Sequence, residues 1–128
     1  MAPSSPCILI VAVSALTALT GCFSDRPLHE KDYQRFWCKK HKGELEFRLN
    51  DGARVDCLTA EYAVEVEYAQ KWAEAIGQSL FYAKSTGRKP GILLILGDKG
   101  DERFARRLRT VTVEEKIKVW TIRPQDLK

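Results

Sequence analysis

The stretch GILLILG, residues 91–97, constrains the fold more than any other part of the chain. It is a continuous apolar run between two glycines, and such a run is typical of a strand that is covered on both faces. A strand of this kind lies at or near the centre of a sheet, with helices packed against that sheet. The run therefore predicts an α/β domain. At 128 residues, the chain has room for one such domain.

The segments before this run predict a helix, three strands and a second helix. The first helix begins at Asp32, and a hairpin follows, with strands over residues 44–49 and 54–58 around the turn Asn50-Asp51-Gly52. Residues 62–68 form a third strand. Residues 69–86 have helical spacing, with an expected core stripe of Trp72, Ile76, Leu80 and Ala83.

The segments after this run extend the sheet. Phe104, Leu108 and Val111 fall on one helical face, and residues 117–122 form a last strand. This predicts a right-handed β-α-β unit. The expected architecture is thus a mixed central sheet with flanking helices, in the order α-β-β-β-α-β-α-β.

The start of the chain predicts export. The first twenty-one residues carry no charged side chain, and the apolar run over residues 8–19 is too short to span a bilayer comfortably. Residues 1–21 are therefore a predicted signal peptide; an uncleaved anchor and a spurious start codon are the alternatives. Leu19-Thr20-Gly21-Cys22 resembles the bacterial lipobox, which implies lipidation of Cys22 and a periplasm-facing, lipid-anchored protein of the cell envelope. Residues 22–31 would be a short tether and residues 32–128 a single domain.

The four cysteines fit this expectation. Once Cys7 and Cys22 are assigned to the N-terminal segment, Cys38 and Cys57 remain and are expected to pair in an oxidising compartment. The alternative is a metal site of Cys38, Cys57 and His41, with His29 as a further ligand.

Acidic residues stand on two of the predicted strands. Glu65 and Glu67 share one face of residues 62–68, and Val64 and Val66 point to the other. Asp56, pointing opposite to its strand neighbours, can approach Glu65 across an antiparallel pair. Clustered carboxylates repel one another unless a hard divalent cation compensates. A solvated strand face is the alternative.

The helix after the acids places a cation and an amide on one face, because Lys71, Ala75, Gln78 and Tyr82 recur at helical spacing. With this helix, the arrangement resembles the PD-(D/E)XK nuclease superfamily, which includes Holliday-junction resolvases and restriction endonucleases. The core of that superfamily runs helix, three-stranded meander, helix, strand. The resemblance implies a restriction-endonuclease-like core that spans most of the chain after residue 31.

The resemblance assigns roles residue by residue. Asp56 matches the metal-binding Asp, Glu65 the (D/E) and Val66 the X of the motif. The next position holds Glu67 in place of Lys. Because some members carry this Lys on the following helix, Lys71 is the displaced candidate and Glu67 an additional ligand. Gln78 matches a Gln that often faces the site.

The implied reaction is hydrolysis of a DNA phosphodiester with Mg²⁺, or Mn²⁺, held by Asp56, Glu65 and the Val66 carbonyl. Lys71 would orient the attacking water or stabilise developing charge. DNA would be bound without sequence preference by surface cations, for which ordinary solubilising charge is the alternative; the candidates are Lys39, Lys40, Lys42, Lys84, Arg88 and Lys89. The alternative function is a non-catalytic envelope lipoprotein that uses the same fold as an interaction scaffold.

Overall fold

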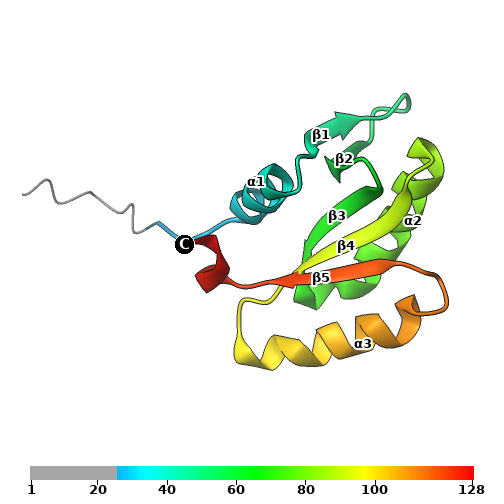
Figure 1. The fold of residues 1–128 in the computed structure, drawn as a ribbon. Coiled ribbons are helices and arrows are strands. Elements are labelled where there is room, and N and C mark those ends of the chain that lie inside the picture. The colour runs from blue at the N-terminus through cyan, green and yellow to red at the C-terminus, as the bar shows by residue number, and fades with distance from the viewer. Residues whose placement is uncertain (1–25) are drawn as a thin grey trace, which may run out of the picture.

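The computed structural model describes residues 26–128, so the predicted signal peptide, the predicted lipidation at Cys22 and the predicted tether up to residue 25 lie outside the described residues. The described part is an α/β domain with a five-stranded mixed sheet between helices (Figure 1). The helices are α1 (Glu30–Lys40), α2 (Trp72–Thr86) and α3 (Glu102–Thr112), with 3-10 turns η1 (Ala69–Lys71), η2 (Lys99–Asp101) and η3 (Pro124–Leu127). The strands are β1 (Glu44–Arg48), β2 (Arg54–Leu58), β3 (Tyr62–Tyr68), β4 (Lys89–Ile95) and β5 (Lys118–Ile122).

The sheet follows the chain, in the spatial order β1-β2-β3-β4-β5. The first three strands form an antiparallel meander, whereas β4 and β5 run parallel to β3. Parallel neighbours need crossover connections, and α2 and α3 supply them. The apolar run is confirmed as a near-central buried strand, since the side chains from Ile92 to Leu96 are at most 1% exposed.

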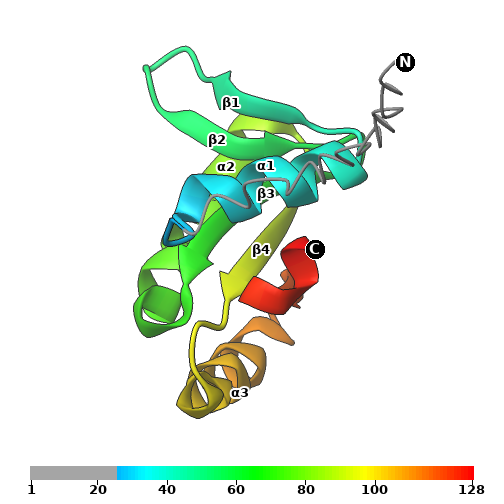
Figure 2. The same cartoon turned by 90° about the vertical axis from the view of Figure 1, so that its left-hand side faces the viewer.

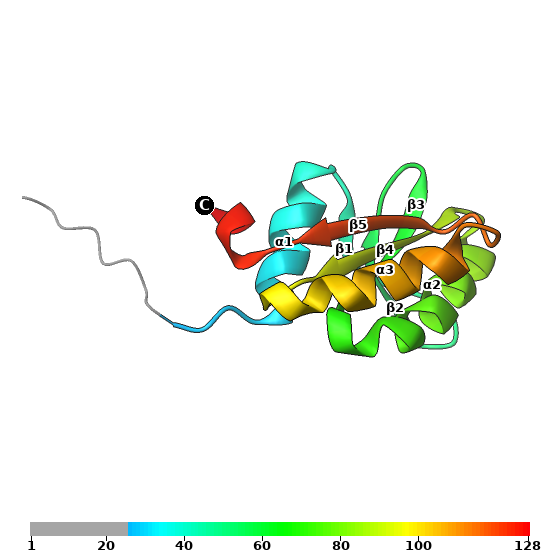
Figure 3. The same cartoon turned by 90° about the horizontal axis from the view of Figure 1, so that it is seen from below.

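The helices cover the two faces of the sheet unequally (Figure 3). Both crossover helices lie on one face, and α1 and the C-terminal turn η3 lie on the other. Figure 2 shows α1 lying across the strands of the meander, with which it is in contact. The first helix begins at Glu30, two residues before the predicted start of the domain.

The expectation that Val55 and Cys57 share one face of β2, opposite to Asp56, is wrong. Val55 packs with Tyr82 on the α2 side, whereas Cys57, two residues later, packs with Trp37 of α1. A regular strand would place Val55 and Cys57 on one face, so β2 must twist at Asp56. Glu46, on the neighbouring strand, has a left-handed φ of 53°, which marks a backbone irregularity beside this twist.

The predicted core stripes of the helices are wrong in part. In α2 the buried side chains are Ala75, Ser79 and Tyr82, while Leu80 is 37% exposed. Small residues at the contact let a helix approach a sheet closely, and the larger apolar side chains then lie at its margins. In α3, Leu108 is buried, but Val111 is 46% exposed. Among residues 26–128, none of the helices has the length and apolar character needed to span a bilayer.

Candidate functional site

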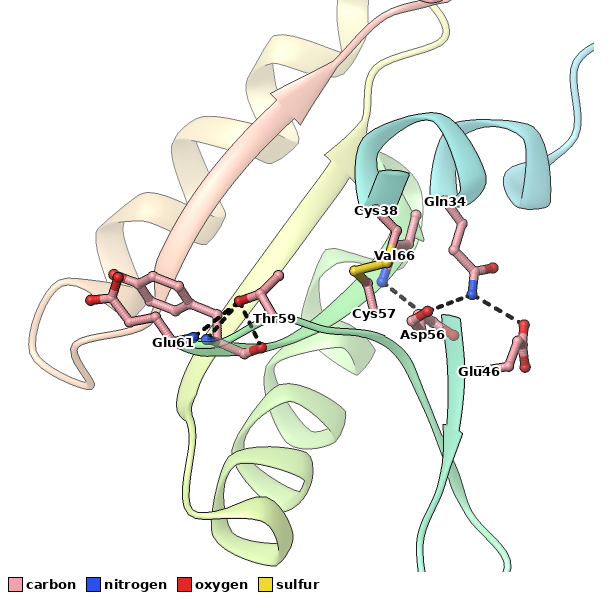
Figure 4. The surroundings of a disulfide bond; sticks show 9 residues. Gln34, Cys38, Glu46, Asp56, Cys57, Thr59, Glu61 and Val66 are labelled. Carbon is pink, nitrogen blue, oxygen red and sulfur yellow. Dashed lines mark hydrogen bonds between the residues drawn. A yellow bond between two sulfur atoms is a disulfide. The ribbon is translucent and has the colours of Figure 1, made fainter. Parts of the chain in front are cut away.

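A disulfide fixes α1 to β2 at the border of the site. Cys38 and Cys57 are bonded, with their Cα atoms 5.7 Å apart (Figure 4). Gly43 packs directly on the bridge, because a Cβ there would lie 2.4 Å from the Cys57 sulfur. The alternative metal site of Cys38, His41 and Cys57 is therefore wrong. His41 instead stacks on Trp37, with ring centroids 3.8 Å apart.

Next to the bridge, Asp56 occupies a gap in the sheet. In the ladder between β2 and β3, Cys57 pairs with Val64 and Leu58 pairs with Ala63. The pairing does not continue to Asp56. The Asp56 carboxylate takes the place of the missing backbone partner: it accepts a hydrogen bond from the Val66 N–H at 2.8 Å (Figure 4). Burial nevertheless raises the pKa of Asp56, and the nearby carboxylates of Glu46 and Glu67 add to this effect.

Gln34 of α1 holds the outer side of the gap. Its Nε2 donates to the Asp56 carbonyl at 2.8 Å and to Glu46 Oε1 at 3.1 Å (Figure 4). Gln34 is only 3% exposed, so these bonds satisfy a buried amide. The amide and the disulfide together fix β2 against α1 on both sides of the Asp56 side chain.

Glu65 is a buried carboxyl group whose hydrogen-bonding capacity is not satisfied. It is 4% exposed, and its Oε2 atom is buried without a hydrogen-bond partner. Its carboxyl group lies within hydrogen-bonding reach of the Asp56 carboxyl. Burial, and then the charge of Asp56, raise the pKa of Glu65 far above the ordinary value. At neutral pH the metal-free pair therefore holds one proton, because two ionised carboxylates cannot share this dry position.

Glu67 is also buried, at 6% exposure, and its Oε1 accepts the N–H of Tyr68 at 2.9 Å. The alternative of a solvated strand face for Glu65 and Glu67 is therefore wrong. Both side chains belong to the sheet face that α2 covers, because Val64 and Val66 pack in the cluster on the α1 side.

Glu30 joins the site from the first turn of α1, and the sequence interpretation missed it. Burial raises the pKa of Glu30 to about 7, with contributions from the negative charges of Glu67 and Asp56. Lys71 acts in the opposite direction and lowers this pKa. Four carboxyl groups from α1, β2 and β3 thus interact with one another, and Lys71 is the nearby cation that acts on Glu30.

The predicted residues of η1 and α2 lie around the acids in different ways. Lys71 is exposed at the end of η1. Gln78 is half-buried and accepts a hydrogen bond from the Tyr82 hydroxyl at 3.0 Å. Burial raises the pKa of Tyr82, and the carboxylates of Glu65 and Asp56 raise it further. Tyr82 therefore lies near the acid pair as a neutral hydroxyl.

Compared with protein-family models, curated proteins and solved structures, the chain gives no match in any of the three. The arrangement of its own residues is therefore the basis for a functional argument.

The donor atoms of the site can be compared with the ligands that a divalent cation prefers. Among residues 26–128, no three His, Cys, Asp or Glu side chains are arranged as a metal-binding group. The predicted set has two carboxylates and a backbone carbonyl. The orphaned Oε2 of Glu65 beside the Asp56 carboxyl is a donor set that fits a hard cation, because it offers oxygen ligands and lacks a compensating charge.

The predicted DNA-binding cations are divided between two regions. Lys39, Lys40 and Lys42 follow one another at the end of α1. The other three lie around the end of α2, where two have partners: Lys89 pairs with Glu61 at 2.8 Å, and Arg88 donates to the Ala60 carbonyl.

The sequence carried weak signals for the missed residues. Tyr82 stands at helical spacing from Gln78, so its position on that face was visible, although its approach to the acids was not. Glu30 and Gln34 are four residues apart on α1, which places them on one helical face. Only the packing of α1 across the meander brings that face to Asp56.

Proposed function

We propose that this chain is a Mg²⁺- or Mn²⁺-dependent DNA phosphodiester hydrolase of the bacterial cell envelope, attached through a lipid on Cys22. One observation carries the proposal: the buried, unpartnered Oε2 of Glu65 next to the Asp56 carboxyl. A buried ionised carboxyl destabilises the fold unless it has a partner. The Glu65 carboxyl therefore lacks a compensating partner in the gap between β2 and β3.

The site is suited to exchange a proton for a cation. In the metal-free chain a proton compensates the Asp56–Glu65 pair. A divalent cation would replace that proton and favour ionisation of both groups. Because the N–H and C=O of one strand residue point to the same side, and the Val66 N–H points to Asp56, the Val66 carbonyl also faces the gap.

The topology supports the resemblance to the PD-(D/E)XK superfamily. The elements from α1 to β4 follow the order of that core, which is a helix, a three-stranded meander, a helix and a strand. The candidate motif lies on its second and third strands. The departure at Glu67 remains, and Lys71, at the start of α2, is the cation that would act in place of the expected Lys.

In the proposed reaction, Asp56, Glu65 and the Val66 carbonyl would hold the cation. The bound cation would polarise the phosphate and lower the pKa of a water molecule. Lys71 orients the attacking water or stabilises the developing negative charge. Glu30, with its pKa of about 7, is placed to accept or release a proton near neutral pH. Tyr82, hydrogen-bonded to Gln78, lies near the acid pair on its α2 side.

Thermal unfolding of the purified chain with and without Mg²⁺ or Mn²⁺ tests the cation. A ligand that binds only the folded state stabilises it, by about 1.4 kcal/mol at ten times its Kd, which is a shift of several degrees. Glu65→Gln should abolish the shift. Glu44→Gln, on an exposed carboxylate of β1, is the matched control and should keep it.

Cleavage assays on single-stranded, double-stranded and branched DNA test the reaction. Lys71→Ala should keep the metal-dependent shift but lose activity by a factor on the order of one hundred, as for loss of one charge-stabilising group. Lys118→Ala, an exposed lysine of β5 outside the predicted DNA-binding set, is the control. Unchanged melting temperatures in both metals, together with intact DNA in all assays, would reject the hydrolase.

A non-catalytic scaffold in the envelope is the second candidate. The presence of Glu67 where the motif has Lys favours it, because Glu67 is buried and bonded to the adjacent N–H. A metal-dependent shift without any cleavage would support this candidate. For either function, fatty-acid labelling should occur in the expressed protein and disappear in Cys22→Ser.

A further inference from the structure

Helix α3 carries a dense group of positive charges. Four of its eleven residues are exposed arginines: Arg103, Arg106, Arg107 and Arg109. Within residues 26–128, the ion pairs of the structure leave all four unpaired, and the acidic Glu102 of this helix pairs instead with Arg123. Four unpaired guanidinium groups on one short helix produce a strong local positive potential.

Three of these arginines form a ridge on the outer side of α3. Ala105, Leu108 and Thr112 are buried, so the opposite side of the helix faces solvent. At 100° per residue, Arg103, Arg106 and Arg107 lie on that opposite side. Phe104 supports the ridge: the guanidinium carbon of Arg103 lies 4.6 Å from the centre of its ring, and that of Arg107 lies 5.7 Å away.

The ridge is connected to the candidate site. Helix α3 contacts η1, the turn that ends in Lys71, and packs beside α2 on the same face of the sheet (Figure 3). A hydrogen bond of 2.9 Å from Gln70 Nε2 to Asp101 Oδ1 joins η1 to the residue that precedes α3. Lys71 and the arginines of α3 therefore stand on two elements that are in direct contact.

We propose that the α3 ridge binds the phosphate backbone of the nucleic acid that the candidate site would cleave. This inference rests on the proposed function and adds the surface that holds its substrate. Arg103, Arg106 and Arg107 lie within about 6 Å of one another along the helix axis. Duplex DNA carries a charge for every ~1.7 Å of its axis, so each arginine can pair with a different phosphate. Such contacts carry no sequence information.

An anionic membrane is the competing occupant, and one feature of α3 argues against it. A helix that lies in a membrane needs a continuous apolar face, but the apolar face of α3 is buried against the sheet, and its exposed valines, Val111 and Val113, lie in or after the last turn.

The test compares two triple variants of the full chain that remove the same charge. One is Arg103→Gln, Arg106→Gln and Arg107→Gln, and the control is Lys31→Gln, Lys118→Gln and Lys128→Gln, three exposed lysines outside the predicted DNA-binding set. Binding to a short fluorescent duplex is measured in EDTA over a range of salt concentrations, so that cleavage does not contribute. The arginine triple should weaken binding and lower the slope of log K against log salt by about three, whereas the lysine triple should change neither.

Three outcomes would overturn the inference. The first is equal weakening of DNA binding by both triples. The second is unchanged DNA binding by the arginine triple. The third is that the arginine triple loses binding to phosphatidylglycerol vesicles while its DNA binding is intact. Because all substituted side chains are exposed, both triples should melt at the wild-type temperature. If the chain does not cleave DNA but binds it through α3, the inference stands and the hydrolase fails. If the arginine triple binds and cleaves like the wild type, the hydrolase stands and the inference fails.

Discussion

The two faces of β3 differ in chemical character: one is apolar and the other is acidic. On one face, Val64 and Val66 pack with Trp37 and with the Cys38–Cys57 bridge in a dry apolar cluster. On the other face, Glu65 and Glu67 are also buried but bear carboxyl groups. Side chains thus alternate along this strand: the valines pack in an apolar layer that stabilises the fold, and the glutamates belong to an acidic layer that opposes folding.

The difference shows where the domain tolerates unfavourable interactions. Burial of an apolar side chain stabilises the fold by roughly 1.5–3 kcal/mol, whereas a buried carboxyl without a partner destabilises it. Strained groups of this kind are typical of functional sites. The apolar α1 side of β3 can therefore offset an acidic site on its α2 side, and substitutions on the two sides should change stability in opposite directions.

The largest expected effect is loss of the bridge on the apolar side. The double change Cys38→Ser and Cys57→Ser should lower the free energy of unfolding by about 2–5 kcal/mol, the usual loss for a native disulfide in a small domain. Urea titration measures this loss. Addition of reductant to the wild type should reproduce it and leave the variant unaffected; a loss below about 0.5 kcal/mol would contradict the stabilising role.

Adjacent residues of β3 provide the sharpest comparison. At pH 7 without metal, Glu65→Gln should raise the free energy of unfolding by roughly 2 kcal/mol, because Glu65 must take up a proton on folding and Gln need not. Val66→Ala, on the other face, should lower it by about 2 kcal/mol through lost burial and a residual cavity. Urea titration at pH 7 compares the two. If both variants are destabilised, the proposed opposition of the two faces is wrong.

The same pair should respond differently to pH. The pKa of Glu65 is raised from 4.5, so the folded state binds more protons than the unfolded state above about pH 4.5. Stability must therefore fall as pH rises toward the folded pKa, by at most about 1.4 kcal/mol per pH unit for one proton. Glu30 adds a change of the same sign between 4.5 and about 7. Glu65→Gln should flatten the profile and Val66→Ala should leave its slope unchanged; equal slopes in both variants would contradict the assignment.

The smallest effect should come from removal of the Tyr82 hydroxyl, which lies near the Asp56–Glu65 pair. Tyr82→Phe removes the hydrogen bond to Gln78 at 3.0 Å and should cost about 1 kcal/mol. The metal-dependent shift in melting temperature should persist, because the Asp56–Glu65 pair is intact. Loss of that shift in thermal unfolding would show that Tyr82 takes part in cation binding.

Much of the fold could be predicted from local patterns. The run at residues 91–97, the Asn-Asp-Gly turn and the change of period after Tyr68 are signals that neighbouring residues produce together. The core stripe of α2 could not be predicted in this way, because Ala75 and Ser79 are small and give little hydrophobic signal. Their size matters only once the helix lies against β3.

Less of the candidate site than of the fold could be predicted from the sequence. Alternation on residues 62–68 was sufficient to place Glu65 and Glu67 on one face. The twist at Asp56, which sends Val55 and Cys57 to opposite faces, depends on interrupted pairing with β3 and on the irregular backbone of Glu46. Glu30 enters through the packing of one helix across three strands. Tertiary contacts of this kind have no local pattern.

The disulfide also affects the order in which the chain can assemble. It joins residues 19 apart, and the β1–β2 hairpin lies inside the ring that it closes. In the oxidised unfolded chain, the end of β2 is thus held near the end of α1, and the entropy of closing that loop is already lost. Helix α1, the hairpin and Asp56 then form a unit of short-range contacts. The slow part of folding is left to the parallel pairing of β3 with β4, which must enclose the whole of α2.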